Sequence, residues 1–566
     1  MNLNVLMVKI LKFLIFLNPF NLWQKKMKQI INTQNMSKET KEKKSKKKDS
    51  KLVKKIKQHM YKWHRAIGLI TIIPVIFWTL SGLMHPFMAH FFKPEIAHEK
   101  LETQVIDKTQ LHFSIQEVLQ KNELTQFKNF RIVTFNNKTY YQLKTIIGEL
   151  WYFDTATAKK LENGDQKYAV WLSRYFLDDQ KSAVKNSEVV TEFTSQYKYV
   201  NRYLPVYKLS FDRPDAMQVY VETSSGKLAT YNPTSRQAFI WFFDTFHNWS
   251  FIDAISNNSI RIITMIFLLS IIGFSALSGI LIYCLLWKQF KKTDSLAPKK
   301  GLRKYHRQIG IWVSLFTLTF AFSGAYHATT KWNPYTLSQM VYEPTFETKE
   351  IPVASNNLDL DWSRFQNASI ISLNDTTYFR CELLEKQKFK TSKSDSNSKW
   401  NKKDDPKSEV IYINAATNKV VPNLDFKYAE FLAYYFTDGA PKLACCEMDQ
   451  GSDEPHVSLE NAKLLDSKLL TDFSSREYGF VNKRLPVVKL AYDTPEKPNY
   501  FIETATSKLA AVVKNSDMVE GYSFAILHKF LFMDWAGKNI RDLTMVVAAL
   551  TILIVSILGF ILFLKK

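Results

Sequence analysis

Two apolar segments of the chain carry histidines at the same spacing. In KWHRAIGLITIIPVIFWTLSGLMH, His64 and His85 lie 21 positions apart, and in KYHRQIGIWVSLFTLTFAFSGAYH the same separation joins His306 and His327. Ionisable residues at membrane depth are costly and usually line a functional site. Neutral imidazole is also a common ligand of transition metals. The spacing therefore indicates metal binding in a membrane as the chemistry that these residues can perform.

Six of the eleven histidines recur between two halves of the chain. They form three pairs: His64 with His306, His85 with His327, and His247 with His528. Any single histidine at a membrane boundary is explained equally well by contact with water or lipid headgroups. Six in register favour a shared function, because the two halves differ almost everywhere else.

Small and cationic residues accompany these histidines. They are Gly68 and Gly310, Ser81 and Ser323, and Arg65 and Arg307. Each glycine follows an inner histidine by four residues and so shares its helix face, and each serine precedes an outer histidine by four. Such small residues leave room for a planar macrocycle, although close packing of helices would use them equally well. The arginines could meet the propionates of that macrocycle or extend to the membrane surface.

The spacing separates the histidines into two levels. On one helix, 21 positions span about 31 Å, so His64 and His85 cannot bind the same iron. His247 and His528 precede their apolar segments on the outer side, at a depth close to the second histidine of each segment. We therefore predict an inner site from His64 and His306. One or more outer sites would use His85, His327, His247 and His528, and electrons would be relayed between the two levels.

Haem b fits these ligands better than zinc or copper. Two histidines without a nearby carboxylate or thiolate make a poor closed zinc site, whereas a haem iron needs only two axial imidazoles. The chain has four cysteines, at Cys284, Cys381 and Cys445-Cys446, and no C-x-x-C. Iron–sulfur clusters and covalently attached c-type haem therefore lack their usual spacing. We expect haem b and assign no catalytic residue.

Four apolar blocks must position these histidines. They are Ile67–Phe92, Ile262–Trp287, Gln308–Thr330 and Leu543–Leu564. Each offers about 20 uncharged residues, the length that crosses a bilayer. Two long polar stretches, about 91–240 and 331–522, lie between them. The predicted fold class is an α-helical membrane protein with four transmembrane helices and two extracytoplasmic α+β domains.

The net charge of +23 is concentrated on one side of this topology. Residues 25–57 hold 14 lysines, residues 288–307 hold eight basic residues against Asp294 alone, and the chain ends in Lys565-Lys566. The positive-inside rule makes that side cytoplasmic. We expect a multi-pass membrane protein with both termini in the cytoplasm, in contact with anionic lipids. No nucleic-acid-binding fold accompanies the lysines, so we expect no nucleic acid as a partner.

The chain reads as a tandem duplication. YVNRYLPVYKLSFDRP (199–214) returns as FVNKRLPVVKLAYDTP (480–495), and Gly279 and Gly559 fall at the same place in their apolar blocks. Because each half contains an even number of crossings, the repeats are parallel and a pseudo-twofold axis along the membrane normal relates them. Alternating residues after 131 predict strands with a turn at Asn136-Asn137. MQVYVETSSGKLATYN predicts a hairpin turning at Ser225-Gly226, and helical patterns occur near 168–178 and 426–436.

These observations divide the chain into eight segments. They are a basic cytoplasmic segment (1–60), transmembrane helix 1 (61–92), a first extracytoplasmic domain (93–240), transmembrane helix 2 with a preceding interfacial segment (241–288), a basic cytoplasmic loop (289–307), transmembrane helix 3 (308–330), a second extracytoplasmic domain (331–522), and transmembrane helix 4 with a preceding interfacial segment (523–566). The second domain carries an insertion at 385–408, rich in Lys, Ser and Asp, which we expect to be a disordered loop.

The motifs WHRAIGL…SGLMH and YHRQIGI…SGAYH, together with LPVYKLSFD and LPVVKLAYD, resemble those of the PepSY-associated transmembrane family. The resemblance covers about 61–566. It implies PepSY-like outer domains and a di-haem b reductase of ferric siderophores in the inner membrane, tied to iron uptake. It also implies that the six paired histidines include the axial ligands, of which two haems use four. The sequence shows no flavin or nicotinamide domain, so electrons would come from a separate cytoplasmic donor or from quinol.

Three functions remain open on the sequence. In the first, the chain is a transmembrane oxidoreductase that reduces a ferric siderophore or another extracytoplasmic oxidant. Trp241, Trp249, Tyr231 and Phe243 would then line a substrate cleft, although an aromatic belt at the membrane surface is the commoner use of such residues. In the second, it is a non-enzymatic PepSY module of the envelope that modulates peptidases or partner proteins. In the third, it transports iron or haem, although the paired Gly/Pro interruptions expected at a midplane site are missing.

Overall fold

The computed structural model describes residues 51–296, 301–331, 340–386, 408–439, 458–473 and 477–565. The chain divides into two compact units, Met1–His59 and Met60–Lys566. The expected basic segment 1–60 lies almost wholly outside the described residues. So does most of the 385–408 insertion, and Cys445-Cys446 are not described either. Everything that follows concerns the second unit.

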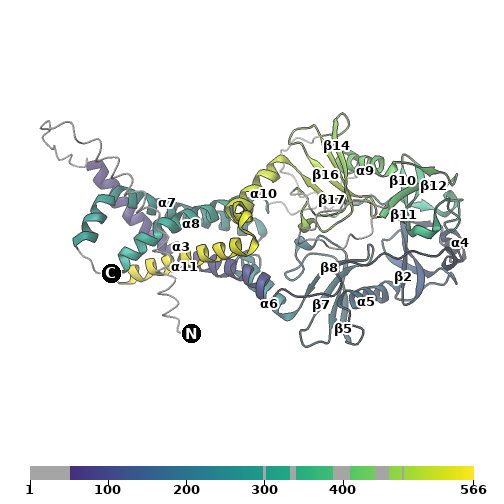
Figure 1. The fold of residues 1–566 in the computed structure, drawn as a ribbon, viewed down its shortest axis with the longest axis horizontal. Coiled ribbons are helices and arrows are strands. Elements are labelled where there is room, and N and C mark those ends of the chain that lie inside the picture. The colour runs from purple at the N-terminus through teal and green to yellow at the C-terminus, as the bar shows by residue number, and fades with distance from the viewer. Residues whose placement is uncertain are drawn as a thin grey trace, which may run out of the picture. The chain divides into compact units, whose positions relative to one another are not determined.

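Four long helices are apolar enough to cross a membrane: α3 (Lys51–Phe91), α7 (Asn258–Leu296), α8 (Leu302–Thr329) and α11 (Lys538–Leu564). This confirms the four predicted spans. The helices α7 and α11 both pack along α8 (Figure 1). Each helix runs past its predicted span, and α7 and α8 extend into the segment 289–307 that was expected to be a loop. The basic side chains there do not end the helices, because Lys and Arg are good helix formers.

The four helices share one apolar core. Val75 of α3, Ile272 of α7, Val313 of α8 and Ile552 of α11 are buried against one another. Trp78 of α3 and Phe316 and Phe320 of α8 pack against the same cluster. The core occupies the stretch of α3 between His64 and Ser81, so it separates the two predicted levels of histidines.

The first of the two β-sheet domains joins α3 to α7, and both domains are called outer domains here after the side of the membrane expected for them. Its elements are β1 (Gln126–Phe127), β2 (Asn129–Phe135), β3 (Lys138–Lys144), β4 (Leu150–Asp154), β5 (Val184–Val190), β6 (Val206–Phe211), β7 (Gln218–Glu222) and β8 (Lys227–Asn232), with helices α4 (Ile115–Lys121), α5 (Gly164–Leu177) and α6 (Thr234–Phe246) and short 3₁₀ turns η1 (Lys108–Gln110), η2 (Tyr199–Asn201) and η3 (Ser250–Ile252). Antiparallel sheets β2-β3-β4 and β5-β6-β7-β8 result. The predicted turn is confirmed, since Asn136 and Asn137 both have positive φ, 51° and 59°. The hairpin and the helix near 168–178 are confirmed as β7-β8 and α5.

The second outer domain joins α8 to α11 with the same order of elements. They are β9 (Phe346–Glu347), β10 (Phe365–Leu373), β11 (Thr376–Leu384), β12 (Ser408–Asn414), β13 (Val420–Val421), β14 (Leu464–Leu470), β15 (Val487–Tyr492), β16 (Asn499–Glu503) and β17 (Lys508–Val513), with α9 (Leu424–Tyr434), α10 (Asn515–Leu527), a π-helical turn η7 (Tyr435–Gly439) and 3₁₀ turns η5 (Thr348–Glu350), η6 (Trp362–Arg364), η9 (Phe480–Asn482) and η10 (Leu531–Ala536). The sheets are β10-β11-β12-β13 and β14-β15-β16-β17. The helix predicted near 426–436 is confirmed as α9.

The two outer domains are joined by reciprocal contacts. The Asn129 side-chain oxygen accepts a hydrogen bond from Ile370 N–H at 3.2 Å, and that of Asn367 accepts one from Ile132 N–H at 2.9 Å. Strands β1 and β9 also pair with each other. These bonds connect the first sheet of each domain across the boundary between the halves.

A buried group of charges lies at the same boundary. Arg484 binds Glu222 at 3.1 Å and Glu503 at 2.9 Å, and all three side chains are at most 1 % exposed. Lys227 pairs with Glu503, and Lys508 pairs with Glu222 at 3.2 Å. Burial alone would raise the pKa of both carboxyl groups, but Arg484 and the lysines outweigh it. They hold the pKa of Glu222 far below its usual range and lower that of Glu503 to about 2. Both carboxylates are therefore charged, and they tie the domains together.

Candidate functional site: two levels of histidines

His64 and His306 face each other across the bundle. His64 belongs to α3 and His306 to α8, and their ring centroids are 6.4 Å apart. Each ring lies against a glycine of a neighbouring helix. A Cβ at Gly279 of α7 would be 3.3 Å from Cε1 of His64, and one at Gly559 of α11 would be 3.1 Å from Cε1 of His306. Because glycine has no Cβ, each imidazole can pack directly against the backbone of the neighbouring helix at these two positions.

The hydrogen bonds of this inner pair determine its tautomers. Nδ1 of His64 lies 2.8 Å from Ser278 Oγ and 3.1 Å from the carbonyl oxygen of Ser275. Ser278 already donates its own proton to that carbonyl at 2.7 Å, so both partners can only accept from the imidazole. Nδ1 of His306 donates to the carbonyl oxygen of Val555 at 3.2 Å. Both rings therefore carry their proton on Nδ1 and keep a lone pair on Nε2.

His247 and His528 are held in a matching way at the other level. They are the C-cap residues of α6 and α10. Nδ1 of His247 lies 3.1 Å from Ser81 Oγ, and Nδ1 of His528 lies 3.1 Å from Ser323 Oγ. Each serine donates its proton to a backbone carbonyl four residues earlier, at 2.6 Å in both cases. The serines therefore accept from Nδ1, and Nε2 again keeps the lone pair. Among the described residues, no hydrogen bond engages Nε2 of these four imidazoles.

Burial keeps the outer pair neutral. Burial lowers the pKa of His247 well below its usual value, and the nearby His528 and Lys331 lower it further. Burial and then Lys529 lower the pKa of His528 to about 3. A neutral imidazole is the form that binds a metal. The effect of His528 on the pKa of His247 shows that the two rings lie in the same region.

A phenylalanine ring lies between each of His85 and His327 and its neighbour in the outer pair, His247 or His528. Phe243 stacks on His247 at 4.4 Å between centroids and lies 6.1 Å from His85. Phe524 stacks on His528 at 4.6 Å and on His327 at 4.3 Å. The six predicted histidines thus do not all converge. His85 and His327 contact the outer pair only through phenylalanines, which the spacing of histidines alone did not reveal.

The surroundings of His85 and His327 differ. Nδ1 of His327 donates to Glu520 at 2.8 Å. Phe239, at the corresponding place on α6, lies 6.4 Å from the His85 ring and offers no acceptor. A carboxylate therefore orients one of these histidines and an apolar ring contacts the other.

The remaining predicted residues surround the inner pair less closely. The Arg65 guanidinium lies 4.8 Å from the ring of Phe563, and that of Arg307 lies 4.4 Å from the ring of Phe290. A Cβ at Gly68 would meet no atom within 4 Å, which indicates open space beside His64, and one at Gly310 would be 3.8 Å from Val555. The arginines cover aromatic rings at the ends of neighbouring helices.

Of the four aromatic residues expected along a substrate cleft, Phe243 reaches the histidines. Trp249 is buried against Trp78, with stacked rings 5.2 Å apart. Tyr231 donates to the carbonyl oxygen of Pro94 at 3.2 Å, and Trp241 is 59 % exposed. The structure also adds Trp78 to this site. Its indole N–H donates to the carbonyl oxygen of His247 at 2.8 Å, a contact that the sequence did not indicate.

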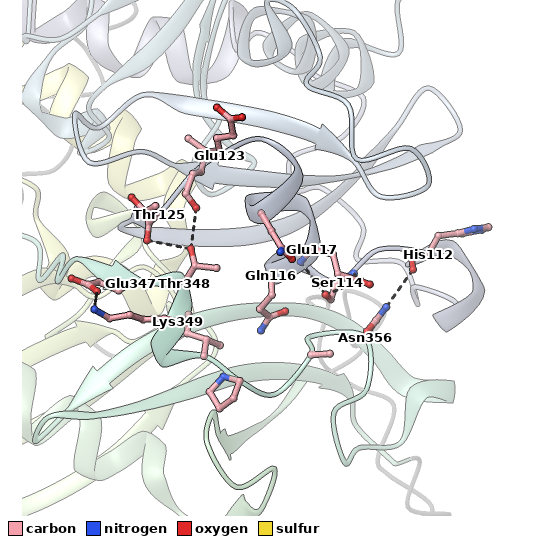
Figure 2. A pocket seen from close by; sticks show the side chains of 15 residues that line it. His112, Ser114, Gln116, Glu117, Glu123, Thr125, Glu347, Thr348, Lys349 and Asn356 are labelled. Atoms are coloured by element: carbon pink, nitrogen blue, oxygen red, sulfur yellow. Dashed lines mark hydrogen bonds and ion pairs between the residues drawn. The ribbon is translucent and has the colours of Figure 1, made fainter.

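An open groove of about 900 Å³ lies apart from the histidine pairs (Figure 2). It is lined by α4 and by the segment 347–356, and α4 lies at the end of the outer domains away from α6 and α10 (Figure 1). Two of its carboxylates are engaged: Glu117 caps α4 through Ser114, and Glu347 pairs with Lys349 at 2.6 Å.

The donor set at both levels consists of imidazoles alone. In the described part of the chain, no group of three or more His, Cys, Asp or Glu side chains gathers around one point. A closed zinc site needs four ligands, whereas a haem iron needs two axial ones. Pairs of neutral imidazoles with free Nε2 atoms fit that second requirement.

The sequence pattern of a known membrane family matches most of the chain. The family is described as PepSY-associated TM region, and it matches residues 142–566. The chain belongs to this family. The match begins in β3 and runs through α7, α8 and α11. The matched region holds four of the six paired histidines: His247, His306, His327 and His528. No curated protein matches the chain. Membership and the four apolar helices together make it a membrane protein.

Proposed function

We propose that this PepSY-associated protein binds two haem b groups and passes electrons across the bacterial inner membrane to a ferric chelate outside, such as a ferric siderophore. His64 and His306 would hold the inner haem, and His247 and His528 the outer one. The single observation that carries the proposal is the shared tautomer of these four imidazoles, each of which donates from Nδ1 and leaves Nε2 for a metal.

The spacing of the inner pair supports the same assignment. With metal–nitrogen distances of ~2 Å, two imidazoles on opposite sides of one metal have centroids roughly 6 Å apart. The observed separation is 6.4 Å. The open space beside Gly68 is compatible with the edge of a macrocycle. Arg65 and Arg307 would pair with the propionates after leaving their aromatic contacts.

Bound haem would supply reversible one-electron chemistry. The chain supplies everything else: Ser81, Ser323 and Ser278 orient the imidazoles, and the apolar core around Val75 and Ile552 keeps water from the space between the levels. His85 and His327 would be on the substrate side, not ligands. The basic residues at 288–307 and at the C-terminus support a cytoplasmic location of both termini. Electrons would then enter from quinol or a separate cytoplasmic donor.

We further propose that the halves are parallel repeats about a pseudo-twofold axis. The recurring order of sheets and the matched C-cap positions of His247 and His528 support this. Each proposed haem site would then take one ligand from each half.

The test is a visible spectrum of the detergent-purified protein, oxidised and then reduced with dithionite. We expect the sharp reduced bands of six-coordinate haem b. His64→Ala and His306→Ala should each remove one haem, and His247→Ala and His528→Ala the other. His85→Ala and His327→Ala are the matched controls and should keep both. A colourless protein from haem-replete cells, or full haem in the His64→Ala and His306→Ala variants, would overturn the proposal and favour an envelope module or a transporter.

A further inference from the structure

The partners of Nδ1 differ between the two levels. At the inner level both imidazoles reach a peptide carbonyl, that of Ser275 at 3.1 Å and that of Val555 at 3.2 Å, and His64 shares its Nδ1 proton between the Ser275 carbonyl and the Ser278 hydroxyl at 2.8 Å. At the outer level the partners are hydroxyl groups, Ser81 and Ser323. The serines are 0 % and 1 % exposed, so water does not replace them as acceptors.

We propose that this contrast gives a haem held by the outer pair a higher reduction potential than a haem held by the inner pair, so that electron transfer outward is downhill. The inference rests on the proposed haem sites. It assigns Ser81 and Ser323 as positioning residues that act through the imidazoles they bind.

The physical basis is the strength of each acceptor. A hydrogen bond from Nδ1–H makes an imidazole a more basic ligand, which stabilises the oxidised metal and lowers its potential. A peptide carbonyl carries a large dipole, ~3.5 D for the whole peptide unit, and is a stronger acceptor than a serine hydroxyl. The inner imidazoles are therefore the more basic ligands, and a haem that they hold would have the lower reduction potential.

A cation at the outer level acts in the same direction. The Lys529 ammonium lies 5.9 Å from the centre of the Phe524 ring, which stacks on His528 at 4.6 Å. A nearby positive charge favours the reduced metal, which carries one positive charge fewer. At the inner level Arg65 is exposed, so water screens its charge, whereas Arg307 is half-buried over the Phe290 ring. At the outer level Glu520 binds His327. The charge of Lys529 therefore adds to the contrast of acceptors and does not carry the inference alone.

The transfer balances without proton movement. Each electron passed outward would oxidise a haem held by the inner pair by one equivalent and would reduce a haem held by the outer pair by one. The electron then reduces one ferric chelate to the ferrous form, and the donor on the cytoplasmic side restores the inner pair. Nδ1–H stays bound to its acceptor throughout.

An optical redox titration of the purified protein tests the inference. We expect two steps, of which His64→Ala abolishes the lower-potential one and His247→Ala the higher-potential one. Ser81→Ala and Ser323→Ala should each shift the higher step upward, because Nδ1–H loses its acceptor, and Ser81→Thr should restore it. Lys529→Gln should shift the same step downward.

Ser270→Ala is the matched control. Ser270 is exposed on α7 and donates to the carbonyl of Ile266 at 2.8 Å, so neither step should move. The inference fails if His64→Ala removes the higher step, or if Ser81→Ala and Ser323→Ala leave the higher step in place or shift it downward. These outcomes differ from failure of the proposed function, in which no haem step is seen at all.

Discussion

The glycines behind the inner imidazoles offer a direct test of how the bundle positions its ligands. An added Cβ would stand 3.1 Å from Cε1 of His306 at position 559 and 3.3 Å from Cε1 of His64 at position 279. Carbon atoms in good contact are about 3.5 Å apart, so alanine must displace the imidazole by roughly 0.4 Å at Gly559 and roughly 0.2 Å at Gly279. The Gly559→Ala variant should therefore be the more severe.

Two opposing free energies decide the size of the effect. Replacing a helical glycine with alanine favours the helix by about 0.5–1 kcal/mol. Overpacking a close contact costs about 1–3 kcal/mol. The fold should therefore lose at most about 2.5 kcal/mol of stability, while the ligand is misplaced. Perturbing the residues that orient a metal ligand typically weakens metal binding 10- to 100-fold, and we expect Gly559→Ala to weaken haem binding at least roughly 10-fold.

The assay is titration of the haem-free protein with haemin, followed by absorbance, alongside thermal unfolding in the same detergent. Gly521→Ala is the matched control, because Gly521 lies in α10 and a Cβ there meets no atom within 4 Å. It should bind haem like the unaltered protein and be no less stable. Unchanged haem affinity in Gly559→Ala, or a weakening in Gly521→Ala as large as in Gly559→Ala, would refute the steric reasoning.

Three further predictions concern the outer domains and the outer pair. Arg484→Met leaves Glu222 and Glu503 buried without their shared cation, and should lower the stability of the outer domains by about 3–5 kcal/mol in chemical unfolding; an unchanged midpoint would contradict this. Because the folded-state pKa values of both carboxyl groups lie below the unfolded value of ~4.3, their stabilisation should be complete above that pH. The stabilisation by Glu503 should be lost as the pH falls toward its folded-state pKa of about 2. Unfolding midpoints at pH 7 and pH 5 should therefore agree, and midpoints below pH 4 should be lower. Trp78→Phe removes the hydrogen bond to the His247 carbonyl, worth about 1 kcal/mol. It should change the low-temperature electron paramagnetic resonance signal of the outer haem alone, and a changed inner signal would count against this contact.

The sequence revealed the histidines but not how they are oriented. His64 and His306 could be assigned to one level from chain positions alone, because both follow equivalent aromatic residues at equivalent ends of apolar blocks. Which outer histidines act together depends on the rotation of α6 and α10 about their axes. That rotation places Ser81 against His247 and leaves His85 behind Phe243, and packing sets it, not spacing.

Internal repetition could not identify residues that break the repeat. His90 has no counterpart among the paired histidines, yet its Nε2 lies 2.9 Å from Asp542, which links α3 to α11. Glu520 binds His327, while its counterpart Phe239 packs beside His85. Gly279 and Gly559 were visible as matched positions, but their role appears only from the 3.3 Å and 3.1 Å approaches of the imidazoles.

A ligand pair drawn from both halves has a consequence for how the sites form. His64 precedes the first outer domain and His306 the second, so the inner pair can close only after both α3 and α8 are in the bundle. The reciprocal contacts of Asn129 and Asn367 and the charges around Arg484 also span the halves. Folding of the first half alone would leave the buried Glu222 without Arg484 and Lys508, and folding of either half alone would leave an imidazole without its mate. A chain cut between α7 and α8 should therefore bind haem only when both pieces are made together, and haem bound by one piece alone would show that the sites lie within the halves.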